Sequence, residues 1–153
     1  MSCIRIVDTS VLCNLLRVPN KDQDAGRAAR EFGEAQQARD VFLLPIPVIY
    51  ETGNHIAQSP NGAKRRAVAI GFVELVRKAF EGEIPFTPTP LQNPEDMTRW
   101  LDEFPNLASA GMGFGDLAIT KVWEEQSELN HGRRVLIWSY DKHLQGYDRP
   151  PRV

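Results

Sequence analysis

An α/β fold with a central parallel sheet is the fold class that the sequence predicts. Short runs rich in Val, Ile and Leu alternate with longer segments of helical periodicity, which is typical of strands joined by crossover helices. Two of the apolar runs, at 4–7 and 135–138, are followed within three residues by an aspartate. The chain of 153 residues is long enough for one core and short for two, so we expect a single domain over residues 1–153.

The first half of the chain is expected to hold two strands and four helices. Leu12, Leu15 and Leu16 give the segment after the first strand one apolar face. Pro47 suits the first turn of a helix, because its missing N–H would have no partner there. The expected elements are a strand at 4–7, a helix at 9–17, a surface helix at 22–40, a strand at 41–46, a helix from 47 to about 58 and a helix at 63–80.

Prolines and glycines divide the second half of the chain. Three prolines within 87–94 predict an extended loop, and the glycines of 108–115 predict a flexible connection. The expected elements are a short strand at 84–86, a helix at 94–104, a last long helix at 116–129, a strand at 135–138 and a turn and tail at 146–153.

The composition is that of an ordinary globular protein, with 42% apolar and 25% charged residues. The apolar runs are too short to cross a membrane, and the segment 1–8 reaches an acid before any long apolar stretch. We therefore expect no membrane span and a cytoplasmic location, with Cys3 and Cys13 as buried free thiols. The net charge of −2 counts against a protein that binds nucleic acid by charge alone, but less against a nuclease whose site needs carboxylates.

Asp8 and Asp141 follow the two apolar runs that end in an acid. In parallel α/β sheets, ligands bind in the crevice beyond the carboxyl ends of the strands. If the two strands are neighbours, both carboxylates face the same crevice, where their like charges repel. A bound divalent cation is the simplest way to keep both of them ionised.

Glu51 and Asp116 extend this set of acids. Glu51 lies in the first turns of the helix after the second strand, and Asp116 opens the last long helix. Carboxylates are hard oxygen ligands that suit Mg²⁺ or Mn²⁺. Acids are also common at helix starts, where they cap N–H groups or complement the helix dipole, so each one taken singly has a structural explanation. Four acids at matching positions favour a metal site.

Four blocks of the sequence resemble, in order, the motifs of the PIN-domain family of ribonucleases, which includes VapC-like toxins. The blocks are DTSVL at 8–12, PVIYE at 47–51, GDLAI at 115–119 and SYDKHL at 139–144, and together they span nearly the whole chain. The resemblance implies a three-layer α/β/α sandwich with a central parallel sheet of four or five strands. It also implies an endoribonuclease that depends on Mg²⁺ or Mn²⁺.

The resemblance also assigns roles and partners. It makes Thr9 and Ser139 supporting hydroxyls, and it implies RNA as the substrate, with an antitoxin protein and a second copy of the chain as candidate partners. The acids that it assigns to catalysis and metal binding are Asp8, Glu51, Asp116 and Asp141.

Two further groups are candidates for contacts with RNA or the metal site. Asn54 and His55 lie three and four residues after Glu51, on the same helical face, where they could touch substrate or orient a metal-bound water. For His55, the preferred explanation is the simpler one, that it packs against or caps Glu51. A basic run could contact RNA phosphates, although such a run is more often a solvated face. Its residues are Lys64, Arg65 and Arg66.

Other functions remain open at this point. A PIN-like module that only binds RNA or protein would share the fold without the cleavage. A haloacid-dehalogenase-like phosphatase also starts from an aspartate after the first strand, but it needs a second acid two residues later, where this chain has Ser10. A receiver-type signalling domain needs paired acids after its first strand, and Asp8 has no acidic neighbour.

Overall fold

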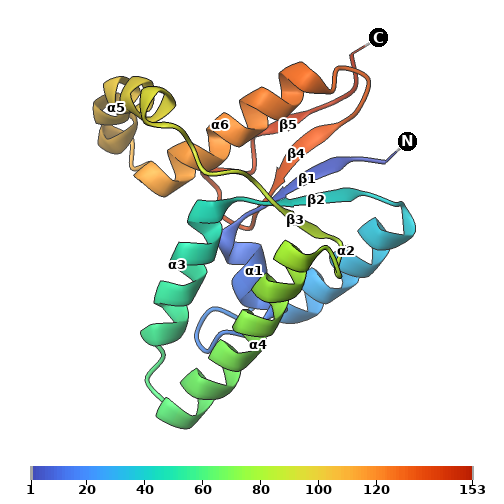
Figure 1. Ribbon diagram of the computed structural model, residues 1–153, viewed down its shortest axis with the longest axis vertical. Coiled ribbons are helices and arrows are strands. Elements are labelled where there is room, and N and C mark those ends of the chain that lie inside the picture. The colour runs from blue at the N-terminus through green and yellow to red at the C-terminus, as the bar shows by residue number, and fades with distance from the viewer. Residues whose placement is uncertain (1, 153) are drawn as a thin grey trace.

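A mixed, mostly parallel sheet runs through the computed structural model, which describes residues 2–152 (Figure 1). Within that range the strands are β1 (Ile4–Val7), β2 (Val41–Leu44), β3 (Phe86–Pro88), β4 (Val135–Trp138) and β5 (Asp148–Arg149). The helices are α1 (Thr9–Leu15), α2 (Ala25–Gln37), α3 (Ile46–Ala57), α4 (Gly62–Glu81), α5 (Pro94–Ser109) and α6 (Phe114–Leu129). The predicted α/β class is confirmed. None of the helices in the described residues is long and apolar enough to cross a membrane.

The strand order places β1 at the centre of the sheet. The order is β3-β2-β1-β4-β5, and β1 pairs in parallel with both β2 and β4. The register aligns Ile4 with Val41 on one side and with Val135 on the other. The carboxyl ends of β1 and β4 therefore lie next to each other, as the argument from Asp8 and Asp141 requires.

The expected central parallel sheet is confirmed for β1 to β4, but the expectation of only a turn and tail at 146–153 is wrong. Residues 148–149 form β5, which pairs antiparallel with β4. The two residues of β5 are Asp and Arg, so the sequence carries no apolar strand signal there. The strand is held by backbone pairing and by the buried guanidinium of Arg149, which donates to the carbonyls of Asn130 and Arg133 at 2.7 and 3.0 Å.

Several boundaries in the first half move for local reasons. Helix α1 ends at Leu15, because Arg17 adopts a left-handed conformation with φ of 55°. Helix α2 starts at Ala25, and the side chain of Asn14 accepts a hydrogen bond from the N–H of its N-cap residue, Asp24. Strand β2 ends at Leu44, where Pro45 already serves as the extended N-cap of α3.

The second half differs from expectation in the loop and helix that precede α6. Strand β3 covers 86–88 instead of 84–86, so part of the expected proline-rich loop belongs to the sheet. Helix α5 continues through Pro105 to Ser109, because Phe104 and Leu107 pack against a cluster around Trp100. The connection to α6 therefore shrinks to 110–113. Since α6 begins at Phe114, Asp116 lies inside its first turn.

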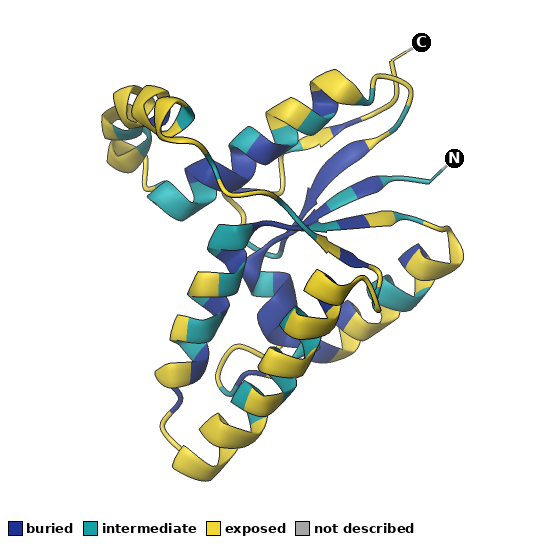
Figure 2. Cartoon of the chain, in the orientation of Figure 1, coloured by how far each residue is buried: buried dark blue, intermediate teal, exposed yellow. Residues whose placement is uncertain are grey.

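The core lies on and beneath the strands (Figure 2). Ile6, Val7 and Val135 are fully buried, and Val11 and Leu12 of α1 are equally buried. Four aromatic rings gather on the sheet, with centroids 5.1 to 6.4 Å apart; they belong to Phe32, Phe42, Phe86 and Trp138. The ends of β1 and β4 are thus anchored in close-packed surroundings, which limits the movement of the residues that follow them. Cys13 is buried and Cys3 is half-buried, and both are free thiols.

Candidate functional site

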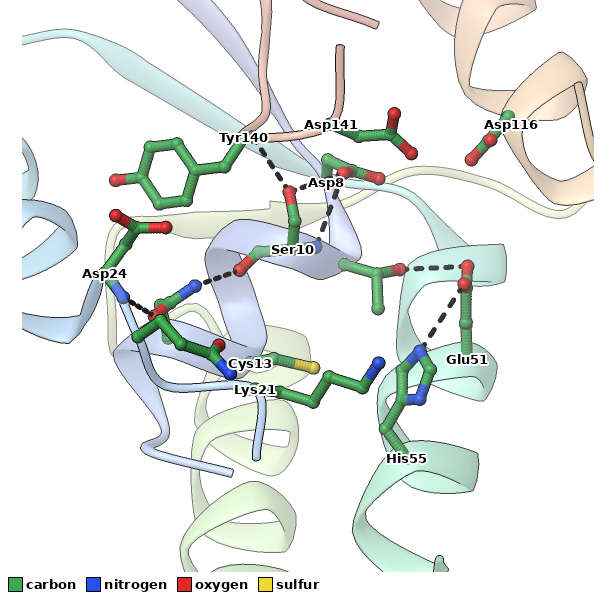
Figure 3. A pocket seen from close by; sticks show the side chains of 13 residues that line it. Asp8, Ser10, Cys13, Lys21, Asp24, Glu51, His55, Asp116, Tyr140 and Asp141 are labelled. Carbon is green, nitrogen blue, oxygen red and sulfur yellow. Dashed lines mark hydrogen bonds and ion pairs between the residues drawn. The ribbon is translucent and has the colours of Figure 1, made fainter. Parts of the chain in front are cut away.

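A hollow of about 300 Å³ opens where β1 and β4 end, and all four predicted acids line it (Figure 3). Two of the acids follow strands, Asp8 after β1 and Asp141 after β4. The other two lie on helices, Glu51 on α3 and Asp116 on α6. We call this hollow the acid pocket. Its other lining residues are Thr9, Ser10, Cys13, Asn14, Lys21, Gln23, Asp24, His55 and Tyr140.

Asp8 is the most firmly held of these acids. Its backbone is extended, with ψ of 160°, and it caps the start of α1. Its Oδ2 accepts hydrogen bonds from the Ser10 hydroxyl at 2.7 Å, the Ser139 hydroxyl at 2.8 Å and the Ser10 N–H at 3.3 Å. The residue is only 4% exposed. Hydrogen bonds to a buried carboxylate replace the water that it has lost, so these hydroxyls stabilise and orient the charge.

Ser10 and Ser139 also tie the exits of the two strands together. The Ser10 hydroxyl accepts from the Tyr140 N–H, and the Ser139 hydroxyl accepts from the Asp141 N–H, both at 2.9 Å. The two hydroxyl oxygens are 3.2 Å apart. The predicted supporting position of Ser139 thus agrees with its contacts, whereas sequence reasoning missed Ser10, which it considered only as the place of an absent acid.

Glu51 is positioned by its neighbours on two helices. The Thr9 hydroxyl donates to its Oε2 at 3.1 Å, and the Nε2 of His55 lies 3.6 Å from its Oε1. His55 therefore packs on Glu51 one helical turn away, as the simpler expectation had it. Asn54 is exposed and does not line the acid pocket, so the structure does not bring this predicted supporting residue to the site.

Asp116 lies in a different electrostatic environment. Burial and, after it, the negative charges of Asp8, Glu51 and Asp141 together raise the pKa of its carboxyl from 3.8 to about 6. The hydrogen bonds found within residues 2–152 include none to its carboxylate. Next to it, a Cβ on Gly115 would lie 3.8 Å from the Oε2 of Glu51, so the start of α6 closely approaches α3. The carboxylates thus repel one another unless a cation joins them.

The chemistry of this donor set fits Mg²⁺ or Mn²⁺, since every acid offers hard oxygen ligands and the clustered charge favours a divalent ion. Among residues 2–152, however, no three His, Cys, Asp or Glu side chains are already grouped closely enough to hold a metal ion. Binding would therefore require the carboxylates to turn inward from the positions in Figure 3.

The basic run expected to contact RNA lies elsewhere. Lys64, Arg65 and Arg66 are exposed at the start of α4, and Arg65 and Arg66 border a separate hollow between α3 and α4. Lys21 lines the acid pocket instead. No sequence signal marks Lys21, because its position depends on how the loop between α1 and α2 folds back.

Comparison with models of known protein families finds no match, and neither do comparisons with curated proteins and with solved structures. A functional assignment therefore depends on the residues and geometry of the acid pocket.

Proposed function

We propose that this protein is a Mg²⁺- or Mn²⁺-dependent endoribonuclease with a PIN-like, three-layer α/β/α fold. The observation that carries the proposal is the convergence of four acids from distant parts of the chain on one pocket, where burial and, in second place, the charges of the other three acids raise the pKa of Asp116 to about 6. Repulsion between these acids costs stability, and perturbed carboxyls in a hollow are typical of functional sites.

In this proposal the four carboxylates hold the ion and position it. When bound, the ion would lower the pKa of a water molecule and offset charge at the phosphorus atom. The hydroxyls of Ser10 and Ser139 orient Asp8, and that of Thr9 orients Glu51. The water oxygen would add to phosphorus with loss of a proton to solvent, and the bond from phosphorus to the leaving ribose oxygen would break. The ribose oxygen would then take up a proton from solvent, so the products would be a phosphate-ended and a hydroxyl-ended RNA.

The proposal extends to the partners of the protein. An antitoxin protein and a homodimer are consistent with the resemblance of the four sequence blocks to VapC-like toxins.

A second candidate function, a PIN-like module that only binds RNA or protein, is favoured by one observation: no three acids among residues 2–152 are already grouped to hold a metal ion.

The experiment that tests the proposal is cleavage of tRNA, rRNA and mRNA by the purified protein with Mg²⁺ or Mn²⁺, compared with EDTA. The site control is the double variant Asp8→Asn/Asp141→Asn, and the matched control is Glu125→Gln, which removes an exposed acid of α6 outside the acid pocket. We expect cleavage by the wild type and by Glu125→Gln, but not by the double variant or in EDTA.

Two results would count against the proposal. Undiminished cleavage by a folded double variant would exclude the acid pocket as the active site. The absence of cleavage by wild-type protein on all three RNA classes, with either metal, would favour the module that only binds.

A further inference from the structure

Lys21 is a cation set among acids. Of the described residues that line the acid pocket, it contributes the one Lys or Arg side chain, against the carboxylates of Asp8, Asp24, Glu51, Asp116 and Asp141. Figure 3 shows this side chain extending toward His55 and Glu51, on the side of the pocket away from Asp141.

The ammonium of Lys21 is nevertheless unpaired. None of the ion pairs found within residues 2–152 involves Lys21. The residue is exposed, so its amine remains in contact with solvent. Its charge still acts on the base of the pocket. Burial and the charge of Glu51 raise the pKa of the Cys13 thiol to about 11, and the positive charge of Lys21 opposes this rise. The ammonium is thus near the acids and free to meet an anion from outside.

The loop that carries Lys21 is fixed to the same helix as the Asp8 network. Asn14 is 5% exposed; its amide donates to the Ser10 carbonyl at 2.8 Å and accepts from the Asp24 N–H at 2.8 Å. The Lys21 N–H donates to the carbonyl of Val18, a fully buried residue, at 2.9 Å. The backbone of Lys21 is therefore held relative to Ser10 and, through it, to Asp8.

RNA that enters the acid pocket meets a strongly negative surface. Its phosphates need positive charge beyond the ion that the acids would hold, because contacts to phosphates supply most of the sequence-independent affinity. The basic run at the start of α4 borders another hollow, so it does not provide that charge at the pocket. Because the backbone of Lys21 is already fixed at the pocket, only its side chain loses conformational freedom when a phosphate binds.

We propose that the Lys21 ammonium binds a backbone phosphate of the RNA strand whose neighbouring phosphodiester lies in the acid pocket. This inference rests on the proposed endoribonuclease function and adds a substrate-binding residue to it. Asn14 is then a positioning residue, since it holds the loop without touching RNA.

The test compares Lys21→Met with wild-type protein in Mn²⁺-dependent cleavage of a single-stranded RNA over a series of salt concentrations. Loss of one charged contact to phosphate is expected to raise KM by about tenfold. The slope of log(kcat/KM) against log[salt] should become shallower by about 0.7, the value for one contact to a single strand. Lys21→Arg should keep most of the wild-type slope, and Lys64→Met, at the basic run of α4, should match the wild type in both measurements.

The outcomes separate this inference from the proposed function. Cleavage by Lys21→Met with unchanged KM and salt slope would overturn the inference and leave the endoribonuclease intact. If the wild type does not cleave, the endoribonuclease proposal fails. The two proteins are then compared by fluorescence anisotropy of labelled RNA in Mn²⁺, and equal affinities with equal salt slopes overturn the role of Lys21. A tenfold effect from Lys64→Met alone would also overturn it, since the contact would then lie on α4.

Discussion

The acid pocket has two halves that are built in different ways. The strand half consists of Asp8 and Asp141, which follow neighbouring parallel strands and are joined through the hydroxyls of Ser10 and Ser139. The helix half consists of Glu51 and Asp116, which lie on α3 and α6. Glu51 receives a hydrogen bond from Thr9, whereas the hydrogen bonds among the described residues leave the Asp116 carboxylate without a donor.

The difference shows how one site can combine fixed and responsive parts. In the strand half, short hydrogen bonds set the geometry of a buried carboxylate whether or not an ion is present. In the helix half, burial and then the neighbouring like charges raise the pKa of Asp116 to about 6, so its ionisation depends on pH and on any cation that enters. Substitutions in the two halves should therefore have their effects in different measurements.

The largest effect is expected from Asp8→Asn on cleavage. The substitution removes a charge from the centre of the strand half, and loss of a proposed metal ligand should lower the Mn²⁺-dependent rate by a factor of about 100 or more. Single-turnover cleavage of RNA measures the rate, and circular dichroism checks that the variant is folded. A folded variant within about threefold of the wild type would mean that the strand half does not hold the ion.

The next effect concerns the stability supplied by the strand half. Ser139→Ala removes a donor to the buried Asp8 carboxylate and the acceptor for the Asp141 N–H. We expect unfolding to become easier by roughly 1.5 to 3 kcal/mol, the range for hydrogen bonds to charged groups. Urea denaturation without metal measures the change. A loss below about 0.5 kcal/mol would show that these hydroxyls do not fix the strand half.

Asp116→Asn should reveal the repulsion within the helix half. Because the folded pKa of about 6 lies above the ordinary 3.8, the unfolded chain releases its proton first, and metal-free wild-type stability should fall as pH rises from about 4 to about 6. Above that range the variant should be more stable than the wild type, by about 1 to 2 kcal/mol after allowance for solvent screening.

Thermal denaturation from pH 4 to 8, with and without Mn²⁺, measures this difference. Added Mn²⁺ should stabilise the wild type more than Asp116→Asn, since the ion removes repulsion that the variant lacks. A variant that is equally destabilised at every pH would indicate that Asp116 stabilises the helix start through its position, and not through its charge state.

The smallest effect is expected from Thr9→Val in the helix half. The substitution keeps the buried shape but removes the hydroxyl that donates to half-buried Glu51 at 3.1 Å. Since Glu51 retains contact with water, we expect a stability loss below about 1 kcal/mol in urea denaturation. A loss as large as that of Ser139→Ala would remove the distinction between the two halves.

The strand half was the more predictable from sequence. Apolar runs that end in an acid identify both the strands and the crevice, so Asp8 and Asp141 could be expected to meet. The contact between Ser10 and Ser139 joins residues 129 positions apart, and no local pattern indicates it. Ser10 could have been suspected only from its position two residues after an N-capping aspartate.

The loops were less predictable, because tertiary contacts decide where their helices begin. The Asn14 side chain accepts a hydrogen bond from the Asp24 N–H and so anchors the loop between α1 and α2, from which Lys21 reaches the acid pocket. A basic run in the sequence pointed instead to 64–66, where three consecutive charges are easy to see but lie at another hollow. Strand β5 was not predicted, because its backbone pairing with β4 defines it and its residues are not apolar.

The short polar strand β5 has a consequence for how the protein avoids aggregation through an open strand edge. All four residues of β4 are buried, so β4 without a neighbour on that side would present an apolar strand with unpaired N–H and C=O groups, which is a template for aggregation. β5 covers this edge with two charged residues, Asp148 and Arg149, and Arg149 donates hydrogen bonds to nearby carbonyls. A tag or truncation that pulled β5 away would expose the strand that leads into the acid pocket to intermolecular pairing.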